Sequence, residues 1–388
     1  VVVGNLTPSI HWYDLFPPSA GQLWEITGGI FMRSVLLLDW QSKQKSTGET
    51  ADMKISTEEA FTTPTLMRAY KKLIDDGNPN EPGFEVLIGA ILDPISEWES
   101  MLQERLPELG SLRMGAMDES GVDMQLIFIT APGVQPFDAD LGSALAAEAN
   151  DILIEAVNAH PARFQGLAAI APQALEAAAK ELQRAVDLGL KGAAINSHTK
   201  GEYLDAPTFR PILEAAEGLG VPIYLHPRNV PPVMAGLFLE RHMEGSFWGF
   251  QTDTALHMLR MIVSGVFDEF PDLKIVVGHL GEGVPFWLDR LDRQYHRNQP
   301  VRERVPRWTG RRLPSEYLMD NFYITSSGHN WDPAVRFVEE VVGEDRLMFA
   351  VDYPYANCNQ QVRQAAGIKL ANPDKFYHLN AKKVFRLD

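Results

Sequence analysis

Titratable side chains stand directly after short apolar segments of this chain. Four of these segments are followed directly by an acid or a histidine, namely Glu58, His226, His279 and Asp352. Two carboxylates and one imidazole, from Glu58, Asp352 and His226, are a ligand set that suits Zn²⁺ or Mn²⁺ and leaves positions open for water or a substrate. His279 is then expected to act as a general acid or base beside the metal-bound group.

Further polar residues are expected on the same rim. Glu282 follows His279 by three residues and can orient its ring and tune its pKa. Thr130 ends another apolar segment and is a candidate substrate contact. His198 follows a further segment, and for it a substrate contact and an ordinary surface histidine are equally open interpretations. Phe61 is expected to wall an aromatic ring, together with aromatic residues nearer the end of the chain.

The apolar segments themselves predict the fold. Each is five to seven residues long and mostly apolar, as in a parallel strand buried on both faces. The eight segments are Met53–Thr57, Met124–Ile129, Phe164–Ile170, Gly192–Asn196, Val221–Leu225, Leu273–Gly278, Asn321–Thr325 and Leu347–Val351. Helical patterns alternate with them, so the sequence predicts an α/β fold, a (β/α)₈ TIM barrel with its active site at the carboxyl ends of the strands.

The competing α/β architecture is a doubly wound open sheet, which would need a switch-point glycine motif such as G-x-G-x-x-G. No such motif follows any of the apolar segments. Residues 62–110 separate the first two strands and are predicted to form a helical insertion near the barrel mouth. Residues 227–252 are predicted to be a loop near the mouth. Residues 1–52 are interpreted as an N-terminal extension of a barrel domain spanning 53–388.

The net charge and the cysteine content of the chain indicate its classes of binding partner and its compartment. The net charge is −16 over 388 residues, which argues against nucleic acids and anionic membranes as general partners. A single cysteine, Cys358, excludes an internal disulfide framework and suits a reducing compartment. The sequence contains no run of about 18 apolar residues, so no transmembrane helix is expected. The start of the chain lacks the pattern of a secretory signal peptide. We therefore expect a cytoplasmic protein.

Four motifs together resemble the amidohydrolase superfamily. They are Lys54–Phe61 (KISTEEAF), Leu225–Arg228 (LHPR), Gly278–Glu282 (GHLGE) and Asp352–Tyr355 (DYPY), in consistent order along residues 53–388. The most similar branch is the metal-dependent, non-oxidative decarboxylases of hydroxybenzoates, which act on 2,3-dihydroxybenzoate, γ-resorcylate or 5-carboxyvanillate. These enzymes are related to aminocarboxymuconate semialdehyde decarboxylase.

The resemblance implies roles for individual residues. It assigns Glu58, His226 and Asp352 as metal ligands, and His279 with Glu282 as an acid–base pair. It also implies that Arg290 and Tyr355 lie near the substrate, with Arg105 of the expected insertion as a further candidate.

One residue departs from the superfamily pattern. Ala60 stands where many members carry a second histidine ligand on the first strand, which weakens the case for a binuclear hydrolase site. Several of the decarboxylases lack that histidine as well. The expected cofactor is therefore one divalent ion, Zn²⁺ or Mn²⁺, held by three protein ligands.

The expected reaction is reversible release of CO₂ from an ortho-hydroxybenzoic acid, with the proton supplied by Asp352 or His279. A metal-dependent hydrolase or hydratase of a lactone or unsaturated acid is the alternative on the same barrel, and a binding barrel without catalysis is the third hypothesis. The expected partner is a small aromatic carboxylic acid. The resemblance further implies a homodimer or homotetramer.

Overall fold

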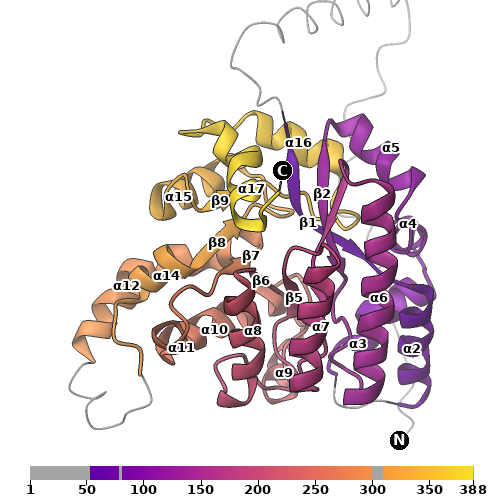
Figure 1. The fold of residues 1–388 in the computed structure, drawn as a ribbon, viewed down its shortest axis with the longest axis horizontal. Coiled ribbons are helices and arrows are strands. Elements are labelled where there is room, and N and C mark those ends of the chain that lie inside the picture. The colour runs from indigo at the N-terminus through magenta and orange to yellow at the C-terminus, as the bar shows by residue number, and fades with distance from the viewer. Residues whose placement is uncertain (1–52, 78–80, 299–308, 388) are drawn as a thin grey trace, which may run out of the picture. The chain divides into compact units, whose positions relative to one another are not determined.

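The computed structural model describes residues 53–77, 81–298 and 309–387 (Figure 1). The predicted N-terminal extension, residues 1–52, lies outside the described residues, so its boundary stays a prediction. None of the helices within the described part of the chain is long and apolar enough to cross a membrane.

All strands of the barrel are parallel and follow one another in chain order. Each of the eight predicted segments overlaps a strand, and the segment Phe164–Ile170 contains two short ones. The strands are β1 (Ile55–Phe61), β2 (Met124–Ile129), β3 (Phe164–Gly166), β4 (Ala168–Ala169), β5 (Ala193–Asn196), β6 (Ile223–His226), β7 (Ile275–Val277), β8 (Phe322–Thr325) and β9 (Leu347–Met348).

Backbone hydrogen bonds close these strands into a barrel. The Leu167 amide donates to the Ile127 carbonyl at 2.9 Å, which joins β4 to the first three strands. At the other seam, the Ala60 amide donates to the Tyr353 carbonyl at 2.7 Å and the Asp352 amide donates to the Glu58 carbonyl at 3.0 Å. The fold is thus a (β/α)₈ barrel, as the sequence predicts.

The first strand is longer than its apolar segment indicates. Glu58 and Glu59 were expected just beyond it, yet both lie inside β1, because polar partners compensate their burial. Glu59 accepts the Tyr353 amide at 2.8 Å and the Ser56 hydroxyl, and so fastens β1 to the segment after β9. Burial raises the pKa of Glu59 to about 8.

Side-chain alternation along the strands divides the core. An inner cluster fills the barrel and includes Phe128, Tyr224, Val276 and Tyr323. A larger outer cluster lies between the strands and the helices. Because successive side chains point to opposite faces, His226 shares the inner face with Tyr224, two residues earlier.

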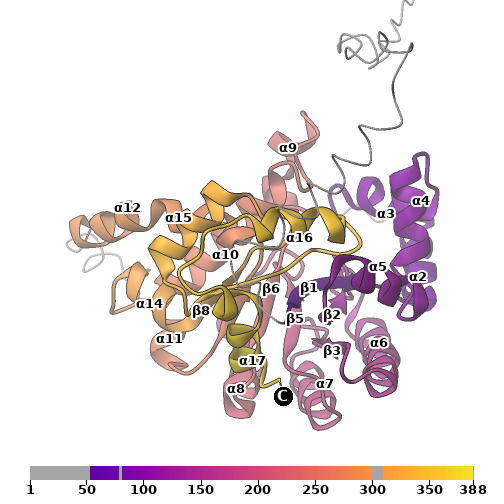
Figure 2. The same cartoon turned by 90° about the horizontal axis from the view of Figure 1, so that it is seen from above.

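Helices surround the strands (Figure 2). Those that follow strands of the barrel are α6 (Ala139–Ala159), α7 (Leu175–Asp187), α8 (Arg210–Leu219), α10 (Gly249–Val263), α11 (Val266–Glu269), α12 (Val284–Arg297), α14 (Pro314–Asn321), α15 (Asp332–Val342), α16 (Cys358–Ala366) and α17 (Asn380–Phe385). Short helical turns η2 (Pro207–Phe209), η3 (His279–Gly283) and η4 (Lys375–Leu379) complete them.

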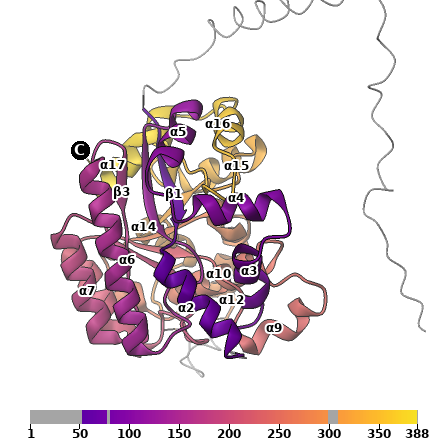
Figure 3. The same ribbon diagram turned by 90° about the vertical axis from the view of Figure 1, so that its right-hand side faces the viewer.

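The stretch between β1 and β2 is helical. It holds α2 (Pro64–Asp75), α3 (Phe84–Leu92), α4 (Glu97–Arg105) and α5 (Ser111–Ser120), seen toward the viewer in Figure 3. The prediction of a loop over residues 227–252 was wrong in part, because this stretch contains α9 (Pro232–Leu239). Pro231 and Pro232 suggested a loop, but Pro232 occupies the first turn of α9, where proline is well tolerated.

Candidate metal and active site

A cavity of about 570 Å³ opens where the strands end. Its polar wall includes His226, His279 and Asp352, which come from β6, the turn after β7 and the segment after β9. Its apolar wall comes mainly from the β1–β2 helices and the segment after α9, through Val86, Leu87, Ala90, Ile91, Trp98, Leu102, Phe247 and Phe250. A mostly apolar pocket with a few convergent polar groups, at the carboxyl ends of barrel strands, is the expected form of an active site.

Glu58 is held at one carboxylate oxygen and open at the other. Its Oε2 accepts a hydrogen bond from the Tyr224 hydroxyl and another from the Thr325 hydroxyl at 3.3 Å. Its Oε1 has no hydrogen-bond partner although it is buried. This oxygen lies 3.4 Å from His226 Nε2 and 3.5 Å from His279 Nε2. A Cβ on Gly278 would overlap the carboxylate, so glycine is required there.

His226 presents its Nε2 lone pair toward Glu58. Its Nδ1 lies 2.9 Å from Asn196 Oδ1, an acceptor, so we assign the Nδ1–H tautomer. Asn196 lies directly opposite His226 in the β5–β6 register. The unprotonated Nε2 is the atom that a metal ion binds, and the bond to Asn196 fixes the ring as partners of metal-bound histidines do.

His279 is positioned by a left-handed turn. Its φ is 49° and that of Glu282 is 54°, a conformation that costs roughly 1–2 kcal/mol per non-glycine residue. The turn brings His279 Nδ1 to 2.8 Å from Glu282 Oε1. The opposite nitrogen, Nε2, lies 3.9 Å from Asp352 Oδ2. Backbone strain of this kind is concentrated at functional sites.

The electrostatics follow from these contacts. Burial alone would raise the pKa of Glu58, but the neighbouring His279 and His226 rings and the hydrogen bond from Tyr224 outweigh it and lower the pKa to about 2. Burial would lower the pKa of His279, but the carboxylates of Glu58 and Glu282 raise it well above its usual value. Burial raises the pKa of Asp352. The cluster therefore combines an ionised Glu58 with two groups able to carry a proton.

The donor set fits a divalent cation. Ligands that bind one cation at about 2.0–2.2 Å lie roughly 3–4 Å from one another, and Glu58 Oε1 and His226 Nε2 meet this condition at 3.4 Å. Asp352 lines the same cavity and is the candidate for a third donor. Among the described residues no group of three or more His, Cys, Asp or Glu side chains is arranged to hold a metal ion, so the fit rests on the unpartnered Glu58 oxygen and the fixed His226 tautomer.

One predicted substrate contact, Tyr355, lines the cavity, and a second, Thr130, is buried beside it. The Tyr355 hydroxyl is 2.6 Å from the Thr130 hydroxyl. The Trp98 ring of α4 is 6.4 Å from the Tyr355 ring. The helices between β1 and β2 thus reach the substrate side of the barrel.

The other four predicted substrate contacts are not brought to the cavity. Phe61 is part of the outer core. His198 is buried, with Nδ1 accepting from the Gly201 amide and Nε2 donating to the Asn229 carbonyl, and burial lowers its pKa to about 3. Arg105 lies beside a separate groove on α4, and Arg290 is exposed on α12 with its guanidinium 5.9 Å from the Trp287 ring. None of these four therefore lines the site in a single chain.

Sequence reasoning missed three residues that position the ligands. They are Tyr224 and Thr325, which hold Glu58, and Asn196, which holds His226. A signal was available for two of them. Tyr224 precedes His226 by two residues and so shares its face, and Asn196 ends the neighbouring strand.

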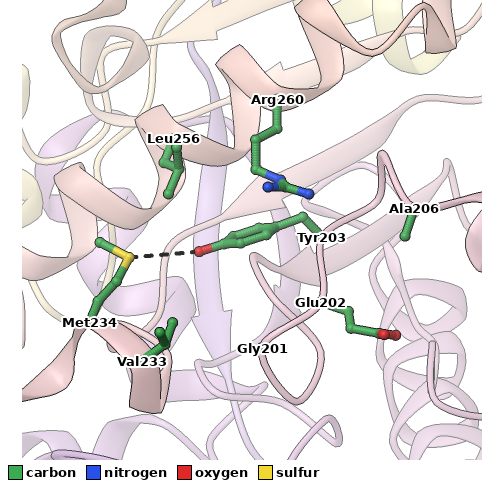
Figure 4. Close-up of a pocket in the computed structure, with 8 residues that line it drawn as sticks. All are labelled: Gly201, Glu202, Tyr203, Ala206, Val233, Met234, Leu256 and Arg260. Carbon is green, nitrogen blue, oxygen red and sulfur yellow. Dashed lines mark hydrogen bonds between the residues drawn. The ribbon is translucent and has the colours of Figure 1, made fainter. Parts of the chain in front are cut away.

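A smaller pocket, of about 410 Å³, lies between α9, α10 and the loop after β5 (Figure 4). Two of its polar groups, Tyr203 and Arg260, are already paired. The Tyr203 hydroxyl donates to Asp253 at 2.6 Å, and Arg260 stacks on the Tyr203 ring while pairing with Asp205 at 2.8 Å. The lining residues include a single carboxylate, Glu202, and no histidine or cysteine, so they supply no metal-ligand set and this pocket is not the candidate active site.

Known proteins are similar to this chain in sequence and in fold. The amidohydrolase family model matches residues 87–387. The γ-resorcylate decarboxylase of Rhodococcus jostii is 36% identical over 310 residues, which cover 76% of this chain and 92% of that protein. The same activity name is carried by a Rhizobium relative that is 36% identical over 307 residues, covering 76% of this chain and 92% of that protein.

Solved structures of two decarboxylases are also similar to this chain. A 5-carboxyvanillate decarboxylase from Novosphingobium aromaticivorans, complexed with manganese and 4-hydroxy-3-methoxy-5-nitrobenzoic acid, superposes with a TM-score of 0.85 and 39% identity, covering 88% of this chain and 98% of that one. A 2,6-dihydroxybenzoate decarboxylase from Rhizobium superposes with a TM-score of 0.75 and 33% identity, covering 87% of this chain and 99% of that one. The chain belongs to the amidohydrolase family.

Proposed function

We propose that this chain is a metal-dependent, non-oxidative decarboxylase that converts an ortho-hydroxybenzoic acid to a phenol and CO₂. The observation that carries the proposal is the unpartnered Oε1 of Glu58, which faces His226 and His279 beside a largely apolar cavity. Relatives at 33–39% identity that carry decarboxylase names support the same reaction class, a carboxy-lyase.

Glu58, His226 and Asp352 are the residues that would hold the divalent ion. Manganese is present in a solved relative, and we propose Mn²⁺ ahead of Zn²⁺ for this chain. When bound, such an ion would fix the substrate carboxylate and its ortho hydroxyl and draw electron density from them.

The chain's own residues then position the aromatic ring. Apolar side chains of α3 and α4 and Phe250 form a wall against which a ring packs and from which water is excluded. Tyr355 also lines this cavity. Its hydroxyl is tied to Thr130, which holds the Tyr355 side chain in place.

Proton delivery falls to the His279–Asp352 pair. Glu282 orients His279 through Nδ1, which leaves Nε2 directed toward Glu58 and Asp352. The pair donates one proton to the ring carbon that bears the carboxylate. The bond between that carbon and the carboxylate then breaks, its electron pair restores the aromatic ring, and CO₂ leaves. The two groups titrate together, so we assign the proton to the pair.

A hydratase is the second candidate. A 2-keto-4-carboxy-3-hexenedioate hydratase from Sphingobium is 27% identical over 197 residues, covering 47% of this chain and 54% of that protein. A metal-dependent hydrolase or hydratase would add water to its substrate, whereas a decarboxylase removes CO₂. The mass of the product therefore separates the two reactions.

We further propose a cytoplasmic homodimer or homotetramer. The lone cysteine, Cys358, is buried and free, in keeping with a reducing compartment. Exposed apolar side chains line the cavity, namely Val86, Trp98 and Phe247, and such surface favours contact with another copy.

The reverse reaction gives a direct test. Mn²⁺-loaded protein is incubated with a phenol and concentrated ¹³C-bicarbonate, and carboxylated products are followed by NMR. We expect label at a carboxylate ortho to the hydroxyl. Absence of label, together with addition of water to an unsaturated acid, would move the assignment to the hydratase.

A further inference from the structure

Glu244 is a buried carboxylate that the proposed chemistry does not use. It lies in the segment after α9 and lines the active-site cavity. The residue is 4% exposed, and its Oε2 has no hydrogen-bond partner. A buried acceptor without a donor is costly, typically by about 1–3 kcal/mol and by more when it is charged. A ligand in the cavity is the natural source of the missing donor.

The surrounding backbone is shaped to admit this side chain. Gly83, just before α3, has φ +73°, and a Cβ there would lie 2.7 Å from Glu244 Cγ and 2.8 Å from Asn229 Nδ2. A glycine is therefore needed where the β1–β2 insertion approaches both residues. Asn229 also lines the cavity, and its carbonyl is fixed by the bond from His198 at 3.0 Å.

His242 lies on the same wall, but it is exposed and its Nδ1 is 3.9 Å from Glu244 Oε1, beyond hydrogen-bonding distance, so Oε2 keeps no partner. The lining residues that the structure describes include no lysine or arginine. Arg228, next to Asn229, is 1% exposed and paired with Glu81. Glu99, the other glutamate on the wall, is occupied in the capping box of α4.

We propose that Glu244, together with Asn229, forms a subsite for a hydrogen-bond-donating substituent on the substrate ring, such as a second hydroxyl or an amino group. The same carboxylate repels a second carboxylate on the ring. This inference rests on the proposed function and narrows it. It separates this chain from its relative named for 5-carboxyvanillate, a compound with two carboxylates.

Binding of inert analogues tests the subsite without turnover. In 2-nitrophenols the nitro group stands in for the reacting carboxylate. Calorimetry on Mn²⁺-loaded protein would compare analogues that carry a further hydroxyl at each ring position with their methoxy counterparts, which cannot donate. The carboxylated member is 4-hydroxy-3-methoxy-5-nitrobenzoic acid. The proteins are wild type, Glu244→Gln, Glu244→Leu and the control Glu240→Gln, whose carboxylate is exposed in the same segment.

We expect at least one hydroxylated analogue to bind wild type about tenfold more tightly than its methoxy counterpart, as loss of a hydrogen bond to a buried charge predicts. The ratio should fall below about threefold in Glu244→Leu and stay unchanged in Glu240→Gln. Glu244→Gln keeps the shape and an acceptor, so it should fold normally and bind the carboxylated analogue at least about fivefold more tightly than wild type.

Equal hydroxyl-to-methoxy ratios in wild type and Glu244→Leu would overturn the subsite. So would a carboxylated analogue that binds wild type and Glu244→Gln equally. CO₂ release is measured in parallel on hydroxybenzoates. Its absence would refute the decarboxylase assignment, whereas the binding ratios would still decide the role of Glu244.

Discussion

Tyr224→Phe removes one oxygen atom from the buried support of Glu58. The Tyr224 hydroxyl donates to Glu58 Oε2 and is 2.9 Å from the Thr325 hydroxyl. After the substitution only Thr325, at 3.3 Å, remains to hold Oε2. The Glu58 carboxylate then loses the constraint that directs Oε1 toward His226 and His279.

The size of the effect follows from that lost bond. A hydrogen bond to a charged group contributes about 1.5–3 kcal/mol. At about 1.4 kcal/mol per tenfold, this corresponds to a loss of roughly 10- to 100-fold in metal affinity, the range seen when partners of metal ligands are removed. Because the proton-donating pair is untouched, kcat at saturating metal should fall less than the affinity for Mn²⁺.

The assay is a competition titration of metal-free protein with Mn²⁺ against a chelating dye. Tyr323→Phe is the matched control, because Tyr323 belongs to the same inner cluster but packs against Arg346 with its ring, at 4.7 Å. An unchanged Mn²⁺ affinity in Tyr224→Phe, or an equal loss in Tyr323→Phe, would refute the reasoning.

Three further predictions concern the ligands, the proton donor and a buried acid. Glu58→Ala should abolish stoichiometric metal uptake, measured by elemental analysis, and retained metal would contradict the ligand set. His279→Asn should keep the metal but lower kcat by about 10²- to 10⁴-fold, and near-normal turnover would remove His279 from the mechanism. Burial raises the pKa of Asp253 to about 6 from 3.8, so its contribution to stability is present below about pH 4 and is lost as the pH rises through 6. The free energy of unfolding of Asp253→Asn, measured with urea, should therefore rise by about 3 kcal/mol relative to that of wild type between pH 4 and 7. A difference in unfolding free energy that does not change with pH would contradict this.

The fold was predictable because its signals are local. Eight short apolar segments separated by helical periods leave few alternatives to a parallel barrel, and each segment overlaps a strand. The end of β1 was harder to predict. Glu58 and Glu59 indicated a strand end, but Tyr224 and Tyr353 supply partners from distant positions, and a local pattern does not reveal them.

The candidate site was predictable in its ligands and less so in its substrate wall. Residues at strand ends converge in any barrel, so Glu58, His226, His279 and Asp352 could be grouped before the structure was seen. Arg290 lies on a helix, where the side that faces the cavity depends on the helix rotation, and it is exposed. Glu244 gave no signal at all, because its burial depends on how the segment after α9 packs against Gly83.

The central claim is metal-dependent release of CO₂ at the Glu58–His226–Asp352 site. The most direct measurement is CO₂ release from salicylate, 2,3- and 2,6-dihydroxybenzoate and 5-carboxyvanillate, with and without a chelator and after Mn²⁺ is restored. We expect CO₂ release from at least one ortho-hydroxy acid, and we expect the chelator to stop this release and Mn²⁺ to restore it. Metal-loaded protein that releases CO₂ from none of them would contradict it.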